Sequence, residues 1–198
     1  MNKLLLATHN RGKVAEFRDM LGNLVEEIVC AADYHLPEPA ETGTTFVDNA
    51  LIKSRAAMAA TNIPCLADDS GLSVAALSGA PGVYSADWAG VPRDFTVAMK
   101  KLHDELGGKV NGQRAAFVSV LTLSRPDQPD EVFEGRCEGT LIWPPRGEKG
   151  FGYDPMFVPD GHTKTFAEMS PDEKNTLSHR AKAVEKFTAF LGNNIVVG

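Results

Sequence analysis

The sequence predicts an α/β protein, because short apolar runs typical of strands alternate with segments typical of helices. The first apolar run, Lys3 to Ala7, is followed by a polar loop and then by a helix from about Lys13 to Leu21. With 198 residues and 43% apolar content, the chain can form one sizeable domain, or one domain with two lobes, and disorder is excluded. We therefore expect a single globular domain over residues 1–198.

Charge and cysteine content exclude several classes of protein. The net charge of -6 argues against a protein that coats nucleic acid, which usually has a basic face. The cysteines are odd in number and lack metal-ligand spacing, so we expect reduced thiols and a cytoplasmic location; they are Cys30, Cys65 and Cys137. Polar residues follow the N-terminal apolar run at once, so we expect neither a signal peptide nor a membrane span.

The N-terminal half continues with a strand, a helix and another strand. The second strand covers Glu27 to Ala32, and a helix from Thr45 to about Ala60 is rich in helix-forming residues. Thr45 and Asp48 resemble a capping box at the start of this helix. The strand from Pro64 to Ala67 then leads into a pair of aspartates.

This aspartate pair is the most informative feature of the chain. An apolar run meets Asp68 and Asp69, and Ser70-Gly71 follows, so we expect the strand to stop here in a turn at an active-site edge. Adjacent carboxylates repel each other unless a cation, hydrogen-bond donors or open solvent compensate. Mg²⁺ is the natural candidate, since it takes one or two carboxylates and completes its shell with water and substrate phosphates. A solvated turn is the alternative.

The second half begins with a loop and a helix and then favours antiparallel strands. The loop covers Gly79 to Ser85, and helical periodicity extends from about Asp94 to Leu106. The runs Arg114–Ser124 and Glu131–Cys137 are separated by turn residues, which predicts a hairpin. A further short strand is expected at Met156–Val158.

The C-terminal region begins with a cap at Ser170 and contains a long apolar stripe made of Leu177, Ala181, Val184, Phe187 and Leu191. On one ideal helix, at about 100° per residue, Lys174 and Arg180 flank this stripe and His179 points to the opposite face. If these three side chains serve one ligand, the helix must break after about Lys174 and a second helix must start near Ser178. The alternative is one solvated helix with ordinary surface charges.

Several motifs fall in one order along the chain: Thr8 to Lys13, Glu41 to Phe46 with Asn49, Ala50 and Lys53, Ala67 to Leu72, Gly150 to Pro155, and Ser178 to Arg180. Together they resemble the inosine triphosphate pyrophosphatase family, and its bacterial members most of all. The resemblance implies a central mixed, twisted β-sheet flanked by helices, two lobes with the active-site cleft between them, and a homodimer. It also implies hydrolysis of ITP, dITP and XTP to monophosphate and pyrophosphate, which removes deaminated purines from the nucleotide pool.

The resemblance also implies residue roles. Glu41 and Asp69 supply oxygen ligands for Mg²⁺, and Lys53 and the aspartate pair are catalytic, with Asp69 as general base and Asp68 as the alternative. Substrate contacts extend along the motifs and comprise Thr8, His9, Asn10, Arg11, Gly12, Lys13, Ser70, Phe151, Gly152, Tyr153, Asp154, Lys174, His179 and Arg180.

The hydrogen-bond donors Lys174 and Arg180 indicate which bases the site accepts. Arginine and lysine only donate hydrogen bonds, so they suit the 6-oxo group of hypoxanthine or xanthine and disfavour the 6-amino group of adenine.

Two residues depart from the common family pattern, namely Asp87 and Lys149. A septum-formation-type nucleotide pyrophosphatase with other base preference, or a nucleotide-binding protein without turnover, are the alternative functions.

Overall fold

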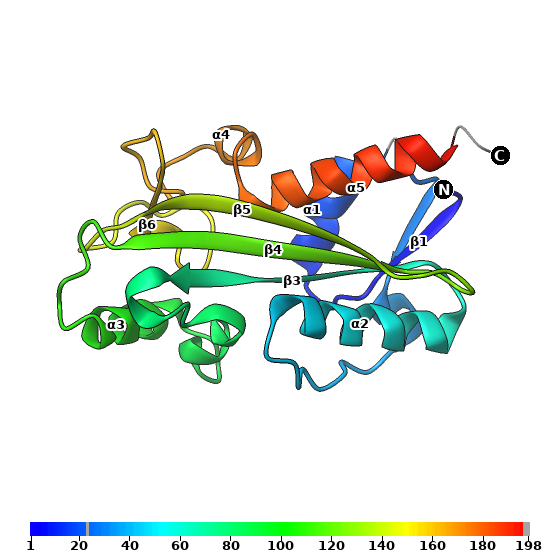
Figure 1. Ribbon diagram of the computed structural model, residues 1–198, viewed down its shortest axis with the longest axis horizontal. Helices are drawn as coiled ribbons and strands as arrows, with labels where there is room; N and C mark the ends of the chain where they lie inside the picture. The colour runs from blue at the N-terminus through cyan, green and yellow to red at the C-terminus, as the bar shows by residue number, and fades with distance from the viewer. Residues whose placement is uncertain (23, 196–198) are drawn as a thin grey trace. The chain divides into compact units, whose positions relative to one another are not determined.

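The computed structural model describes residues 1–22 and 24–195, and its central element is a six-stranded sheet with the order β2-β1-β3-β4-β5-β6 (Figure 1). β1 pairs in parallel with β2 and β3, whereas β5 pairs antiparallel with β6, so the sheet is mixed, as expected. The strands are β1 (Lys3–Leu6), β2 (Glu27–Cys30), β3 (Cys65–Val74), β4 (Arg114–Ser124), β5 (Glu131–Leu141) and β6 (Phe157–Pro159). The α-helices are α1 (Arg11–Leu21), α2 (Phe46–Thr61), α3 (Phe95–Glu105), α4 (Pro171–Asn175) and α5 (His179–Ile195).

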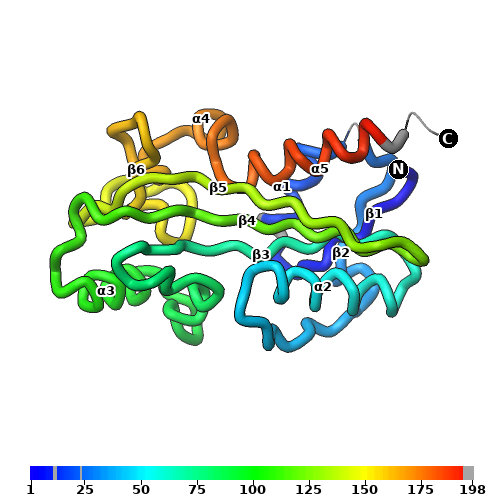
Figure 2. The backbone as a smooth tube through the Cα atoms, viewed as in Figure 1, coloured from blue at the N-terminus to red at the C-terminus, as the bar shows by residue number. Residues whose placement is uncertain are grey.

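The described residues group into two compact units. Unit 1 contains Met1–Asp69, Val120–Glu134 and the C-terminal part of the chain from Ala183, and unit 2 contains Ser70–Ser119 and Gly135–Lys182. The chain passes from one unit to the other within β3, β4, β5 and α5, whose course can be followed in the tube of Figure 2. Each unit has its own hydrophobic core.

Unit 1 buries both faces of its strands, and the alternation of side chains decides which residue meets which helix. Leu4, Leu6 and Leu66 pack in one cluster with α1 and α5. Leu5 and Cys65, at the alternate positions, belong to a second cluster that includes residues of α2. Figure 1 shows α1 and α5 on one side of these strands and α2 on the other. Within unit 1, the even-numbered positions of β3 therefore face α1, and the odd-numbered positions face α2.

The expected stop of β3 before the aspartates is wrong. The strand continues through Asp68 and Asp69 to Val74. Two physical reasons are visible: each aspartate has a lysine partner, and the strand regains apolar packing because Leu72 and Val74 are fully buried in the core of unit 2. β2 is shorter than expected and ends at Cys30, after which the chain turns into a 3₁₀ helix.

The helix starts follow their capping residues. The Thr45 hydroxyl oxygen accepts a hydrogen bond from the Asp48 backbone N–H and caps α2. The second half of the expected capping box is absent, because the Asp48 carboxylate accepts from the Thr45 hydroxyl. Asp94 caps α3 through the Thr96 backbone N–H.

The C-terminal helical region is broken, which is the arrangement expected if Lys174, His179 and Arg180 serve one ligand. α4 ends at Asn175 and α5 begins at His179. A full capping box joins Ser170 and Glu173 at the start of α4. The short α4 therefore leaves Lys174 and His179 on separate helices, as a shared ligand requires.

The predicted hairpin is formed by β4 and β5, which are neighbours in the sheet. The connection from 125 to 130 is too short for a parallel crossover, so the strands run antiparallel. β5 extends beyond the expected end at Cys137 to Leu141.

All three cysteines are free. Among the described residues, no helix combines the length and apolarity needed to cross a membrane.

β5 and β6 approach closely at Gly139, where a Cβ atom would lie 2.3 Å from the Val158 carbonyl oxygen and 2.6 Å from the Phe157 ring. We expect Gly139→Ala to lower the free energy of unfolding by about 1–3 kcal/mol, because neither backbone nor ring can yield without moving the edge strand. Urea denaturation measures the change.

The matched control is Gly192→Ala in α5, where a Cβ atom meets nothing within 4 Å. This variant should keep or raise the free energy of unfolding, since alanine is the better helix residue. An unchanged urea midpoint for Gly139→Ala would contradict the close approach.

Candidate active site

Asp68 and Asp69 leave β3 on opposite faces, and each meets its own lysine. Asp68 shares the face of Leu66, and its Oδ2 lies 2.7 Å from Nζ of Lys13 in α1. Asp69 points to the α2 side, where its Oδ1 lies 3.0 Å from Nζ of Lys53. The pleat of the strand thus separates the adjacent carboxylates, so they need two cations on two faces.

Lys53 joins Asp69 to a second carboxylate from a distant loop. Its Nζ lies 3.0 Å from Oε1 of Glu41, as well as 3.0 Å from Oδ1 of Asp69. The same helix holds this loop a second time, because the buried Asn49 side chain accepts a hydrogen bond of 2.8 Å from the Gly43 backbone N–H. α2 therefore brings together residues that lie far apart in the sequence.

Burial and neighbouring opposite charges shift the pKa values of Asp69 and Lys53 in opposite directions. Burial raises the pKa of the Asp69 carboxyl group, and the attraction of Lys53 only partly opposes this, while Glu41 and Asp68 raise it further. Burial lowers the pKa of the Lys53 ammonium group, but Asp69 and Glu41 together outweigh it, so the pKa lies above its ordinary value. Asp69 Oδ2 is buried and has no hydrogen-bond partner among the described residues. Lys53 stays charged beside a carboxylate oxygen that can still accept a proton.

Glu41 and Asp69 are also the carboxylates that fit a metal ion. They lie around one Nζ on the same side of the sheet, while Asp68 lies on the other side. No group of three or more His, Cys, Asp or Glu side chains suited to a metal occurs among the described residues. Mg²⁺ needs only one or two carboxylates when phosphate oxygens and water complete its shell. The donor set therefore fits the expected pair of metal ligands.

The loop between β1 and α1 shapes the start of the helix that carries Lys13. Thr8 Oγ1 accepts from the Asn10 backbone N–H at 3.1 Å, and Asn10 Oδ1 accepts from the Lys13 backbone N–H at 3.2 Å. These contacts place Lys13 in the first turn of α1. Arg11 and Gly12 begin this helix, and their side-chain positions lie outside the described part of the structure.

His9 contacts a different loop. Its Nε2–H donates to the Leu36 carbonyl oxygen at 2.8 Å, and its Nδ1 lies 3.3 Å from Oε1 of Glu38. The ring thus braces the segment that leads to Glu41. Both ring nitrogens already have neighbours within unit 1.

In unit 2, the buried Asp154 carboxylate organises an aromatic ring and a cation. Its Oδ2 accepts from the Phe151 backbone N–H at 2.9 Å and from Lys174 Nζ at 2.6 Å. The Phe151 ring is 54% exposed, with Lys174 Nζ 5.1 Å from its centroid. Gly152 has a φ of +70°, which lets the chain turn between Phe151 and Asp154. An exposed flat ring beside an ammonium group is suited to stack on a base.

Tyr153 belongs to the core instead. It is 2% exposed, and its hydroxyl donates to the Ser85 carbonyl oxygen at 3.0 Å. Burial raises the pKa of the Tyr153 hydroxyl. Tyr153 therefore anchors the segment that carries Phe151 in the core of unit 2, and its hydroxyl group is bonded to the Ser85 carbonyl oxygen.

His179 and Arg180 start α5 and are each 5% exposed. The His179 ring stacks on Phe117 with ring centroids 4.9 Å apart and planes 14° apart. Arg180 donates from Nη2 to Ser70 Oγ at 3.2 Å. His179, Arg180 and Ser70 were expected at the site from the sequence, whereas their neighbour Phe117 was not, because it sits in an apolar run with no local sign of this contact.

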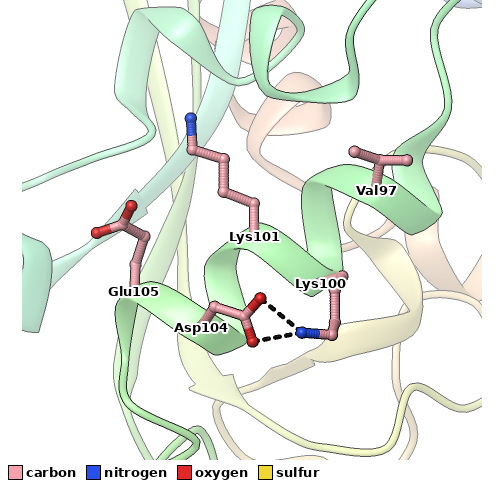
Figure 3. Close-up of a pocket in the computed structure, with 5 residues that line it drawn as sticks. All are labelled: Val97, Lys100, Lys101, Asp104 and Glu105. Atoms are coloured by element: carbon pink, nitrogen blue, oxygen red, sulfur yellow. Dashed lines mark hydrogen bonds and ion pairs between the residues drawn. The ribbon is translucent and has the colours of Figure 1, made fainter.

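A pocket of about 470 Å³ lies along α3 and contains none of the predicted site residues. Figure 3 shows two lysines and two carboxylates along it, with Lys100 paired to Asp104. The lining residues are Val97, Lys100, Lys101, Asp104 and Glu105. The charges balance, so this pocket offers no excess of cations for a triphosphate.

Comparison with known proteins agrees with the resemblance found in the sequence. The model of the Ham1 family matches residues 4–190. This chain belongs to the Ham1 family. Solved structures agree: it matches the Staphylococcus aureus Ham1 protein with a TM-score of 0.90 and 37% identity, over 98% of this chain and 100% of that one. It also matches the nucleoside-triphosphatase / dITP/XTP pyrophosphatase of Mycobacterium abscessus, with a TM-score of 0.78 and 42% identity over 93% and 98%.

Curated relatives of this chain carry the name dITP/XTP pyrophosphatase. The protein of Ruegeria pomeroyi is 55% identical over 188 residues, which is 93% of this chain and 92% of the relative. The protein of Caulobacter vibrioides is 53% identical over 190 residues, which is 96% and 97% of the two chains.

The Lys53 contacts predict a coupled effect on stability in this Ham1 protein. Lys53→Met leaves the buried Asp69 without its cation and should lower the free energy of unfolding by about 1–3 kcal/mol, the partial exposure keeping the loss below that of a fully buried pair. Adding Asp69→Asn should restore part of this loss. Denaturant titration of the single and double variants checks it, and strictly additive losses would show that the two side chains do not interact.

Proposed function

We propose that this chain hydrolyses non-standard purine nucleoside triphosphates, namely ITP, dITP and XTP, to the monophosphate and pyrophosphate. The observation that carries the proposal is the buried Asp69, which pairs with Lys53 beside Glu41 and keeps one carboxylate oxygen available. Membership of the Ham1 family and the names of its curated relatives support the substrate class.

In the proposed reaction, a water molecule attacks the α-phosphorus. The bond between the α-phosphorus and the oxygen that bridges it to the β-phosphorus breaks, and pyrophosphate leaves. Asp69 takes the proton of the attacking water, because its Oδ2 is buried and has no hydrogen-bond partner among the described residues, so it can act as a general base. Asp68 is the alternative base, with its Oδ2 held by Lys13.

The phosphates require cations, since the chain has a net charge of -6. Glu41 and Asp69 would hold Mg²⁺, which when bound neutralises charge on the phosphate oxygens. Lys13 and Lys53 add ammonium groups that orient the triphosphate through charge-assisted hydrogen bonds. The backbone N–H groups at the start of α1 extend this cradle.

The base is recognised by residues of unit 2. Stacking on the Phe151 ring contributes about 1–3 kcal/mol, by analogy with base stacking on aromatic residues. Lys174 and Arg180 donate hydrogen bonds to the 6-oxo group, whereas the 6-amino group of adenine has no acceptor to offer. The buried Asp154 carboxylate holds the Phe151 backbone N–H and the Lys174 ammonium group.

We further propose that both units form one catalytic domain, that the enzyme is a homodimer, and that it works in the cytoplasm. The single family match over residues 4–190 supports the first point, and the free cysteines support a reducing compartment. The homodimer is carried by the family resemblance. Size-exclusion chromatography with light scattering tests it directly.

The activity itself is tested with a panel of triphosphates, Mg²⁺ and a pyrophosphate assay. We expect release from ITP, dITP and XTP, little from ATP, and none in excess chelator. Asp69→Asn should reduce turnover by at least about 10³-fold while the protein stays folded, because it removes the base without making a cavity. Glu41→Gln should raise the Mg²⁺ concentration needed for half-maximal rate.

The panel also separates the alternatives. A septum-formation-type enzyme would prefer other bases, and a nucleotide-binding protein would release no pyrophosphate. Near-normal turnover of Asp69→Asn would remove Asp69 from the mechanism.

Arg180 gives a prediction on selectivity. Arg180→Ala should lower kcat/KM for ITP by at least about 100-fold and change that for ATP far less, because a donor stabilises the transition state only with a base that accepts from it. Steady-state kinetics on both substrates provide the measurement. Equal proportional losses would place Arg180 on the phosphates or in the fold.

A further inference from the structure

A buried chain of hydroxyl groups connects α2 to β4 in unit 1. Thr122 Oγ1 donates to Ser54 Oγ at 2.9 Å, and Ser54 Oγ lies 2.9 Å from Ser124 Oγ. All three residues have no exposed surface. Ser124 Oγ then donates to Asp130 Oδ1 at 2.5 Å, so the chain ends on a carboxylate. These four residues are called the hydroxyl network below.

The hydrogen bonds of the hydroxyl network require a defined direction between donor and acceptor, whereas apolar packing between a helix and a sheet does not. The neighbouring positions Leu121 and Leu123 of β4 point into the apolar core on the other face. A buried hydroxyl group costs free energy unless it is hydrogen-bonded. Arg55 closes the network at the surface, where its Nε donates to Asp130 Oδ2 at 2.7 Å. Since every hydroxyl has a defined partner, α2 is fixed in rotation and in height along β4.

This fixed rotation sets the direction of Lys53, the residue next to Ser54. Consecutive side chains on an α-helix diverge by about 100°, so holding Ser54 against β4 determines where its neighbour points. Lys53 Nζ meets both Glu41 and Asp69 at 3.0 Å. β4 is the neighbour of β3, so the network fastens the helix to the strand beside the one that carries Asp69.

We propose that the hydroxyl network is a positioning device for Lys53, which it aligns on Glu41 and Asp69 without touching the substrate. The inference rests on the proposed function for its catalytic consequence. Its geometric claim, that loss of a network hydroxyl frees the Lys53 side chain, stands independently of any reaction.

The catalytic claim is tested with a double-mutant cycle. Thr122→Val removes the hydroxyl with little change of volume and should lower kcat for ITP by about tenfold, as expected for a slightly misplaced catalytic group. In a Lys53→Met background, measured at raised enzyme concentration, Thr122→Val should have no further effect. Thr122→Ser keeps the hydroxyl and should retain kcat. The same fold loss in both backgrounds, or no loss in the first, would overturn the proposal.

A second measurement does not depend on turnover. Acylation of lysines by a small amine-reactive reagent, followed by mass spectrometry, reports how freely Lys53 Nζ leaves its partners, with Lys13 as internal reference. Labelling of Lys53 should become faster in Thr122→Val and stay unchanged in Thr122→Ser. Unchanged labelling in Thr122→Val overturns the proposal.

The two measurements also separate the inference from the function. If the wild-type chain releases no pyrophosphate from ITP, the proposed function fails, and the labelling alone decides on the network. If Thr122→Val does not fold, Ser124→Ala takes its place in both measurements.

Discussion

The burial of two adjacent carboxylates in the middle of a strand is the constraint on which the rest of the site depends. Asp68 and Asp69 are 7% and 8% exposed, in a strand that continues for several residues beyond them. Such a pair persists only if each charge is compensated, since an unpaired buried carboxylate is costly. The pleat resolves the conflict, because it directs the side chains to opposite faces where separate lysines meet them. One cation on each face is therefore a requirement of the strand itself.

This requirement determines where the surrounding helices lie. α1 must begin directly after β1 for Lys13 to reach Asp68, and the parallel pairing of β1 with β3 places that loop beside the carboxylates. α2 must lie on the other face for Lys53 to reach Asp69. The same helix also holds the loop of Glu41, through Lys53 and Asn49. Buried ion pairs are weak contributors to stability compared with apolar packing. Their cost is therefore best explained by the chemistry that they prepare.

The sequence predicted the features that depend on local pattern. The break between α4 and α5 was expected on one condition, that Lys174, His179 and Arg180 share a ligand, because on a continuous helix His179 would point away from the other two. The helix cap at Ser170 and the existence of every strand also follow from local chemistry. The continuation of β3 through Asp68 and Asp69 does not follow from local chemistry. Asp-Asp-Ser-Gly is typical of a turn, and the lysines that neutralise the two aspartates lie in other segments.

Other features depend on tertiary contacts that no local pattern reveals. Tyr153 lies in a motif rich in glycine, yet it is a core residue whose hydroxyl is used by Ser85. Thr122 and Ser124 alternate with leucines in an apolar strand, and only the partner Ser54 shows that their hydroxyls are connected. Phe117 becomes relevant only through the His179 ring that stacks on it. Each of these contacts joins residues far apart in the chain.

The central claim is that the lysine-paired carboxylates of β3 form the triphosphate site. A crystal structure with Mg²⁺ and an ITP analogue that has a non-hydrolysable link between its α- and β-phosphates tests it most directly. The account predicts the metal on Glu41 and Asp69, the phosphates on Lys13 and Lys53, and the base against Phe151. A triphosphate bound elsewhere, for example along α3, with both lysine–aspartate pairs intact, would contradict it.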